Sequence, residues 1–271
     1  MTIKQKISAV FRILKKLVGQ PESIFLVLKD ENEYRNYLKR KFNVNEFPTI
    51  DIRKFLPENK SIINNYTFLE GGSMVTDLAL LKSVAALFPE CEYLEIGTWR
   101  GESIVNVADV PGVKCTSVNL SSDEIISMGF PEKYAQEHGC LIRNRENIHS
   151  VFANSRCFDF GSLGKKFDLV FIDGDHSYDG VLNDTRKVLP LLNDERSVII
   201  WHDYSFDPVS PRYSVISAIL DGMPAEYHKH LFHVSNTMCA IFYRQELPSS
   251  STDRNPDKVF RINIEALRFP N

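Results

Sequence analysis

The sequence lacks several features that would mark whole classes of protein. No apolar run approaches the roughly 20 residues that a membrane-spanning helix needs. The N-terminus lacks the apolar core of a signal peptide, because lysines interrupt it. The cysteines are scattered, and no two of them form a CxxC pair: Cys91, Cys115, Cys140, Cys157 and Cys239. This pattern argues against a disulfide framework or a zinc site and predicts free thiols in a cytoplasmic protein.

Neither sign of charge is in large excess. The net charge is −3 at pH 7, from 32 Lys and Arg against 35 Asp and Glu. Because the composition has no excess of basic residues that would attract a polyanion, we expect no nucleic-acid partner. With 271 residues, of which 43% are hydrophobic and 25% charged, the chain can form one large α/β domain with an accessory segment.

Residues 1–20 contain no acidic residue at all. Apolar residues recur there at helical spacing, and the opposite face is basic: Lys4, Lys6, Arg12, Lys15 and Lys16. We expect a helix that ends at Pro21 and that lies on an anionic membrane surface or packs on its own domain or a second subunit. The first alternative makes the protein membrane-peripheral, and the second fits the homo-oligomer that we expect.

The rest of the N-terminal quarter is charged or irregular in pattern. Residues 22–43 predict a further charged helix, and residues 44–70 predict irregular structure around two prolines. We therefore assign residues 1–70 to an N-terminal helical accessory segment. Residues 71–245 form the main domain, and residues 246–271 form a C-terminal tail rich in proline and serine at its start.

Strands and helices alternate from about residue 74 onward. Short apolar segments predict strands at 93–97, 114–120, 148–155, 167–174 and 197–204. Amphipathic patterns predict helices at 74–88, 101–110, 178–192 and 212–223, with a further helix opening at Ser121 or Ser122. This alternation predicts a parallel, doubly wound α/β sheet. The last two strands, 230–236 and 238–244, are too close for a crossover, so they form an antiparallel hairpin.

Ligands of open α/β sheets bind outside the carboxyl ends of the strands, so the residues that follow each strand matter most. After the strand at 93–97 the chain continues as GTWRGES, where Gly97 and Gly101 let the backbone turn tightly and approach a ligand. The acidic Glu95 lies two residues before the first glycine. This G-x-x-x-G spacing differs from the G-x-G-x-x-G of dinucleotide-binding folds, and no P-loop lysine follows it.

Four features together resemble the class I S-adenosylmethionine (SAM)-dependent methyltransferases: LEIGTWRGES, FDLVFIDGDHSYDGV, VIIWHDY and the terminal hairpin. The resemblance covers roughly residues 70–245. The nearest subgroup is the small-molecule and sugar O-methyltransferases that carry IDGDHSY and HDY motifs. The resemblance implies a Rossmann-like, doubly wound seven-stranded sheet of order 3-2-1-4-5-7-6, with one antiparallel strand, and S-adenosyl-L-methionine as the cofactor.

Carried over position by position, the resemblance implies a set of cofactor-binding residues: Glu95, Gly97, Thr98, Gly101, Ser103, Asn119, Ser155 and Asp173. Glu95 would face the amino group of SAM, directly or through water. Ser155 or Arg156 falls where the family contacts adenine. Asn119 stands where the family usually has an acidic residue that accepts both ribose hydroxyls. An amide can still accept one hydroxyl proton, so binding survives with this departure.

The polar cluster that follows the strand at 167–174 joins a second set of residues. A magnesium-dependent branch of methyltransferases takes oxygen ligands from the ends of two neighbouring strands, and the matching positions here are Asp173, His202 and Asp203. Imidazole suits manganese, iron or zinc better than magnesium, so the identity of a divalent metal (Mg or Mn) stays open. Without a metal, His202 or His176 would act as general base. A third reading makes His202 a hydrogen-bonded residue that orients Asp203.

The resemblance implies in-line transfer of a methyl group, in which most of the rate gain comes from holding oxygen, methyl and sulfur collinear. A metal or a base would make the hydroxyl nucleophilic. We name Asp175, His176 and His202 as catalytic candidates, with the first two on a loop that roofs the acceptor. The function we expect is O-methylation of a small-molecule or glycan hydroxyl. The alternatives are an NAD(P)-linked oxidoreductase and a non-catalytic SAM-fold binding protein.

Overall fold

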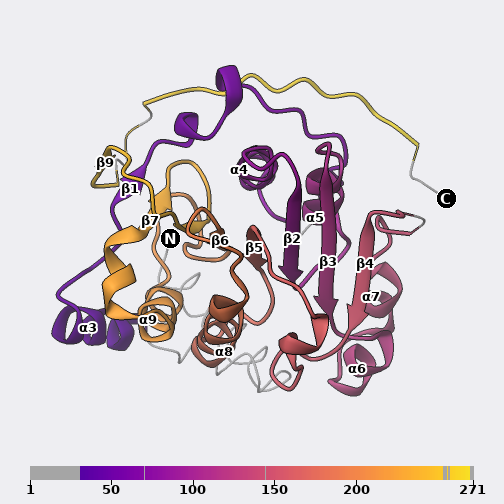
Figure 1. Ribbon diagram of the computed structural model, residues 1–271, viewed down its shortest axis with the longest axis horizontal. Coiled ribbons are helices and arrows are strands. Elements are labelled where there is room, and N and C mark those ends of the chain that lie inside the picture. Colours follow the sequence, from indigo (N-terminus) through magenta and orange to yellow (C-terminus); the bar gives the residue numbers. More distant parts are fainter. Residues whose placement is uncertain (1–30, 70, 144, 253–254, 256, 269–271) are drawn as a thin grey trace, which may run out of the picture.

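The computed structural model describes residues 31–268 apart from 70, 144, 253–254 and 256 (Figure 1). The basic helix predicted for residues 1–20, and with it the choice between a membrane contact and a subunit contact, lies outside the described residues. No helix in the described part of the chain is long and apolar enough to cross a membrane.

One mixed sheet organises the molecule. Among the described residues it has nine strands in the order β4-β3-β2-β5-β6-β8-β7-β1-β9. Their bounds are Thr49–Ile50 (β1), Cys91–Ile96 (β2), Val113–Asn119 (β3), Ile148–Phe152 (β4), Leu169–Ile172 (β5), Val198–Trp201 (β6), Leu231–Val234 (β7), Ala240–Phe242 (β8) and Ser249–Ser250 (β9). From β4 to β6 all neighbours are parallel, and β8 is antiparallel to both β6 and β7. The predicted order 3-2-1-4-5-7-6 and the predicted antiparallel hairpin are confirmed.

The sheet continues past the seven predicted strands at one edge. β1 pairs with β7 in parallel, and β9 pairs with β1 in antiparallel. Each of these strands has only two residues, which is too short for a periodic pattern to show in a sequence. The edge therefore unites a segment from the N-terminal quarter with one from the C-terminal tail, and the domain bounds at 70 and 245 remain a prediction.

Helices cover both faces of the sheet (Figure 1). The α-helices are Glu31–Lys41 (α3), Val75–Ala85 (α4), Glu102–Ala108 (α5), Ser122–Ser127 (α6), Glu132–Glu137 (α7), Tyr178–Val188 (α8) and Tyr213–Gly222 (α9). Helices α4 and α5 lie on one face and α3, α8 and α9 on the other, while α6 and α7 flank β4. Ser121 is the N-cap of α6, in a reciprocal pair of hydrogen bonds with Glu124, as one of the two predicted openings required.

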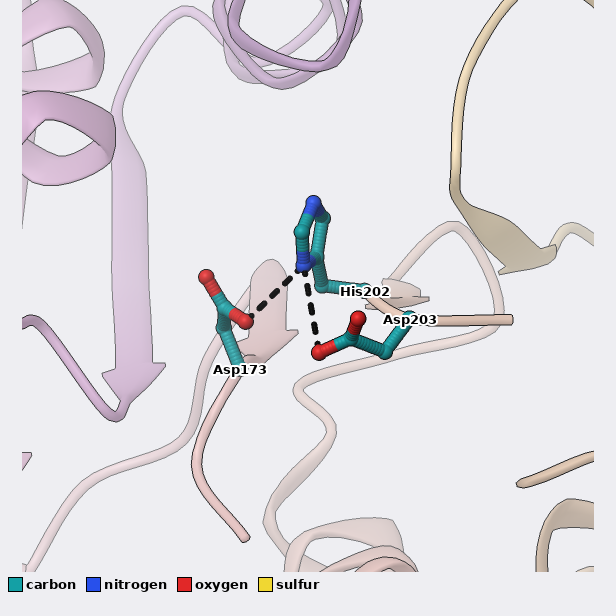
Figure 2. A group of neighbouring side chains, drawn as sticks. All are labelled: Asp173, His202 and Asp203. Atoms are coloured by element: carbon teal, nitrogen blue, oxygen red, sulfur yellow. Dashed lines mark ion pairs between the residues drawn. The ribbon is translucent and has the colours of Figure 1, made fainter. Parts of the chain in front are cut away.

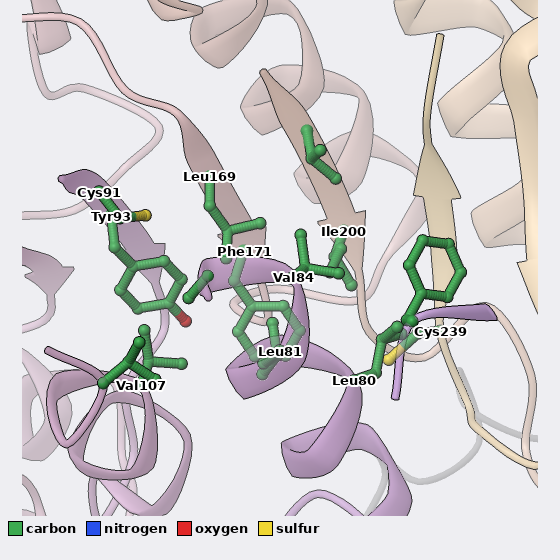
Figure 3. Packing of buried hydrophobic residues seen from close by; sticks show 14 of the residues in the cluster. Leu80, Leu81, Val84, Cys91, Tyr93, Val107, Leu169, Phe171, Ile200 and Cys239 are labelled. Atoms are coloured by element: carbon green, nitrogen blue, oxygen red, sulfur yellow. The ribbon is translucent and has the colours of Figure 1, made fainter. Parts of the chain in front are cut away.

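The central strands are buried on both faces, and each face has its own apolar core. On the α4/α5 side, Leu81 and Val84 pack with Tyr93 and Phe171 (Figure 3). On the α8/α9 side, the strand residues that point to the other face, such as Val170 and Ile172, pack against α8 and α9. Because side chains alternate across a strand, this double burial requires continuous apolar runs such as LVFI and VIIW. It leaves only the strand ends open for polar chemistry.

Candidate active site

The loop after β2 is held by two glycines with positive φ. Gly97 has φ +84°, and a Cβ there would lie 2.2 Å from the carbonyl oxygen of Asp173. Gly101 has φ +99° and precedes the first residue of α5, where a Cβ would lie 2.6 Å from Cγ2 of Ile142. Glycine is needed at both places for the left-handed backbone and for the close approach of neighbouring chain. The first contact brings the β2 loop against the end of β5.

Glu95 of β2 is turned into the protein. Its side chain has no exposed surface and accepts hydrogen bonds from Tyr93 Oη (2.5 Å) and Ser103 Oγ (2.9 Å). Burial raises the pKa of this carboxyl to about 8, although both hydroxyl donors act to lower it. The structure thus brings two predicted cofactor residues, Glu95 and Ser103, into one hydrogen-bonded unit. Their contact with SAM stays a prediction.

Asn119 ends β3 beside the same loop. The backbone N–H of Thr98 donates to its Oδ1 at 3.3 Å, and the Thr98 hydroxyl lies 2.6 Å from Ser117 Oγ. Asn119 is only 8% exposed, so its amide ties the β2 loop to the end of β3. The asparagine that departs from the family pattern therefore has a packing role here, and its contact with ribose is a prediction.

The loops after β4 and β5 are joined by an exposed ion pair. Arg156 Nη2 lies 2.6 Å from Asp175 Oδ2, whose other oxygen accepts from Ser177 N at 2.9 Å. Burial acts to raise the pKa of Asp175, but the arginine and the Ser177 N–H outweigh it, so that pKa is lowered. Ser155, next in chain to Arg156, offers its carbonyl to Lys187 Nζ at 2.7 Å. Asp175 is thus paired with Arg156, apart from the cluster described next.

Three side chains meet at the tips of β5 and β6 (Figure 2). Asp173 follows β5, and His202 and Asp203 follow β6; these strands are parallel neighbours with Ile172 opposite Trp201. Nδ1 of His202 lies 3.0 Å from Asp173 Oδ1 and 3.6 Å from Asp203 Oδ2. One donor atom from each residue lies within 4.8 Å of the other two. The three residues predicted as metal ligands are therefore brought together.

The opposite ring nitrogen of His202 faces a residue that the sequence did not single out. Nε2 lies 3.2 Å from Oδ2 of Asp77, which is fully buried near the start of α4. The two residues are 125 positions apart in the chain, so no local pattern links them. The one available signal was a carboxylate in the first turn of a predicted helix, which indicates capping rather than contact with a histidine.

The carboxylates around His202 have a stronger effect on its pKa than its burial has. Burial alone would lower the pKa of His202, but Asp173, Asp203 and Asp77 raise it well above its usual value. For Asp203, burial is outweighed by His202, His176 and Arg212, and its pKa falls to about 2. Burial raises the pKa of Asp173, with His202 acting in the opposite direction. The carboxylates around His202 therefore favour its protonated form, and the cationic groups around Asp203 favour its ionised form.

His176 and Arg212 complete the rim of the cluster. His176 is about half exposed (52%), and its Nδ1 lies 3.7 Å from Asp203 Oδ2. The guanidinium of Arg212 lies 3.2 Å from the other oxygen of Asp203. Asp203 itself has φ +56°, a left-handed conformation that aspartate tolerates better than most residues. An uncommon backbone conformation at Asp203 therefore orients its carboxylate toward His202 and Arg212.

A family model described as a methyltransferase domain matches residues 94–204. A search of curated proteins found no match to the chain. The fold is similar to that of a proposed caffeoyl-CoA O-methyltransferase from Staphylococcus aureus, at 14% identity and TM-score 0.44, over 84% of this chain and 98% of that one.

Two further solved structures are similar over smaller parts of the chain. The O-methyltransferase TomG from Streptomyces achromogenes shares 14% identity at TM-score 0.40, over 64% of this chain and 81% of that one. TrmN from Thermus thermophilus shares 14% identity at TM-score 0.38, over 55% of this chain. The chain spans 41% of the length of TrmN. At such identities these structures say nothing about the acceptor.

Proposed function

We propose that the protein is a class I SAM-dependent methyltransferase that methylates a hydroxyl oxygen of a small molecule or sugar with the help of a divalent metal ion. The methyltransferase-domain model that matches residues 94–204 supports the first part of this proposal. The observation that carries the proposal is the convergence of Asp173, His202 and Asp203 at the carboxyl ends of β5 and β6. This is the edge of an open α/β sheet where ligands bind.

The donor set fits a divalent cation. Nδ1 of His202 is buried and has no aligned hydrogen-bond acceptor among the described residues, although Asp173 Oδ1 lies at ion-pair distance. One imidazole nitrogen with two carboxylates suits Mn²⁺ at least as well as Mg²⁺. Because the pKa of His202 is raised, a cation that binds at Nδ1 competes with protons for the imidazole. Asp173, His202 and Asp203 would hold the ion.

A bound divalent ion supplies a Lewis acid that lowers the pKa of an acceptor hydroxyl. The hydroxyl proton then needs a receiver, and His202 is a poor one because it is buried and its pKa is raised. His176 is half exposed beside Asp203 and is the better receiver. The acceptor oxygen forms a bond to the methyl carbon as the carbon–sulfur bond of SAM breaks. S-adenosylhomocysteine (SAH) leaves as the product.

The proposal is tested first by ligand binding. Thermal unfolding of the full chain should shift upward with SAM and SAH and stay unchanged with NAD and NADP. If the sulfur ligands gave no shift well above micromolar concentration, the methyltransferase assignment would fail, and a shift with NAD would favour the oxidoreductase alternative.

An activity assay tests whether the methyl group is transferred to oxygen and whether a metal ion is required. Radiolabelled SAM is incubated with a panel of sugars, polyols and catechols, with EDTA and after readdition of Mn²⁺ or Mg²⁺. We expect labelled ether product that EDTA abolishes and Mn²⁺ restores. Turnover that EDTA leaves unchanged would remove the metal from the proposal and leave His176 as the general base. Label that appears only on nitrogen or carbon would contradict O-methylation.

A further inference from the structure

Asp77 lies outside every segment that carries the methyltransferase pattern, yet it contacts the proposed metal site. It occupies the first turn of α4 and has no exposed surface. Its carboxylate forms an ion pair with Nε2 of His202, on the side of the ring opposite to Asp173 and Asp203. The imidazole ring is therefore sandwiched between a fully buried carboxylate and the two carboxylates of the open site.

Two backbone groups hold the Asp77 carboxylate in a single orientation. Oδ2 accepts from Met74 N at 2.7 Å, and Oδ1 accepts from Met238 N at 2.9 Å. Met74 is the N-cap of α4, and Met238 lies in the turn between β7 and β8. Because both oxygens already accept N–H groups, the carboxylate is an acceptor toward its third neighbour as well. Nε2 of His202, at 3.2 Å, must then be the donor.

A histidine that donates from Nε2 presents Nδ1 to whatever lies on the other side of the ring. Here Nδ1 faces Asp173 and Asp203. We propose that Asp77 is a positioning residue that keeps the proton of His202 on Nε2 and aims Nδ1 at the divalent cation. The proposal rests on the metal site of the proposed function. It makes Asp77 an outer partner of the metal, acting through His202.

A purely structural role for Asp77 is the competing explanation, because the same carboxylate caps α4 and holds the β7–β8 turn. The chain offers a matched control in Asp168, which is also buried. Its Oδ2 accepts from Glu92 N at 2.9 Å, and its Oδ1 accepts from Asn193 Nδ2 at 2.9 Å. Asp168 precedes β5, at the opposite end of that strand from Asp173.

The test compares Asp77→Asn and Asp168→Asn in the full chain. Asparagine keeps the size of the side chain, but its Nδ2 group can donate to the ring and so drive the proton to Nδ1. Mn²⁺ is titrated into each SAH-bound protein, and free Mn²⁺ is measured by electron paramagnetic resonance. We expect Asp77→Asn to weaken Mn²⁺ binding by about 10- to 100-fold. Asp168→Asn should stay within about threefold of wild type.

Thermal unfolding separates this role from a loss of capping. Both variants lose a buried acceptor, so we expect both to unfold at lower temperature, while only Asp77→Asn loses metal affinity. If Asp77→Asn bound Mn²⁺ as tightly as Asp168→Asn, the positioning role would be wrong while the metal site stood. If the wild type bound SAH but no Mn²⁺, the metal part of the proposed function would fail and this inference with it. A variant too unstable to purify is replaced by Asp77→Ser, for which the same loss of affinity is expected.

Discussion

Oδ1 of Asp173 and Nδ1 of His202 lie 3.0 Å apart at the tips of two neighbouring parallel strands. This contact is made possible by the register of β5 and β6, which end level with each other. It places an acidic residue and an imidazole, 29 positions apart in the printed sequence, on one small open edge of the sheet.

Replacing Asp203 by asparagine should remove methyl transfer without removing the cofactor. Asparagine tolerates the positive φ of this position (+56°), so the backbone should persist. The carboxylate whose pKa is held near 2 by its cationic neighbours is lost. Loss of a residue that only supports a metal ligand costs up to about 100-fold in activity. Because Asp203 is itself a proposed ligand, we expect kcat to fall by at least that factor. SAH affinity, measured by calorimetry, should stay within about threefold.

The matched variant for that measurement is Asp194→Asn, an exposed carboxylate at the opposite end of β6. It should retain wild-type turnover. An Asp203→Asn protein with more than half of the wild-type kcat would show that this carboxylate takes no part in the reaction.

Replacing Gly97 by alanine should lower the free energy of unfolding by more than the cost of placing alanine at a positive φ. An alanine with positive φ costs about 1–2 kcal/mol. Gly129→Ala is the control for that term, because Gly129 has nearly the same φ (+85° against +84°) and open space where the Cβ would go. At Gly97 the Cβ also collides with the backbone of Asp173, which adds about 1–3 kcal/mol. Urea unfolding of the ligand-free proteins measures the difference, and equal losses in the two variants would contradict the close packing.

The pKa of Glu95 makes the stability of the ligand-free protein depend on pH. Its folded-state pKa, about 8, is raised above the unfolded value of 4.5, so the folded protein holds a proton that the unfolded chain releases. The wild type should therefore lose stability as pH rises from about 4.5 to about 8, by at most about 1.4 kcal/mol per unit from this group. Glu95→Gln has no proton to lose and should lack this part of the slope.

Chemical unfolding at pH 5, 6, 7 and 8 checks the prediction, with the exposed surface change Glu195→Gln as control. The control should show the wild-type slope. Parallel slopes for wild type and Glu95→Gln would mean that Glu95 is ionised in the fold throughout this range.

The thiols should react in an order set by their burial. Cys157 is exposed, whereas Cys91, Cys115 and Cys239 are buried. Burial raises the pKa of Cys91 to about 12 and raises those of Cys115 and Cys239 as well. Because the thiolate is the reactive form, iodoacetamide at pH 8 should label Cys157 first in the native protein. Peptide mass spectrometry reads the order, and early labelling of Cys239 would contradict the packing of β8.

Much of the fold could be predicted because the signals are local or topological. Continuous apolar runs predicted strands buried on both faces, and a separation of about one residue required the last two strands to form a hairpin. The two-residue strands β1 and β9 could not be predicted, because their pairing depends on an edge that exists only after β7 is in place.

Some residues of the candidate site could be predicted from the sequence, and others could not. Polar residues near the ends of predicted strands, such as Asp173 and His202, could be named as candidates because parallel strands expose their carboxyl ends at one edge. Asp77 was not, since it comes from a helix that the sheet brings across to β6. Glu95 could be named as a candidate site residue, but its burial and its hydrogen bonds with Tyr93 and Ser103 depend on how α5 packs.

By itself the sequence determined the alternation of strands and helices and the terminal hairpin, because these follow from periodicity and from a link too short for a crossover. The strand order and the roles of the polar residues at the strand ends were implied by the family resemblance. Only the tertiary structure decided which nitrogen of His202 faces the open site. That choice depends on a hydrogen bond to Asp77, 125 residues away, and on two backbone N–H groups that hold this carboxylate. Long-range contacts of this kind form only when the whole sheet and its covering helices are assembled.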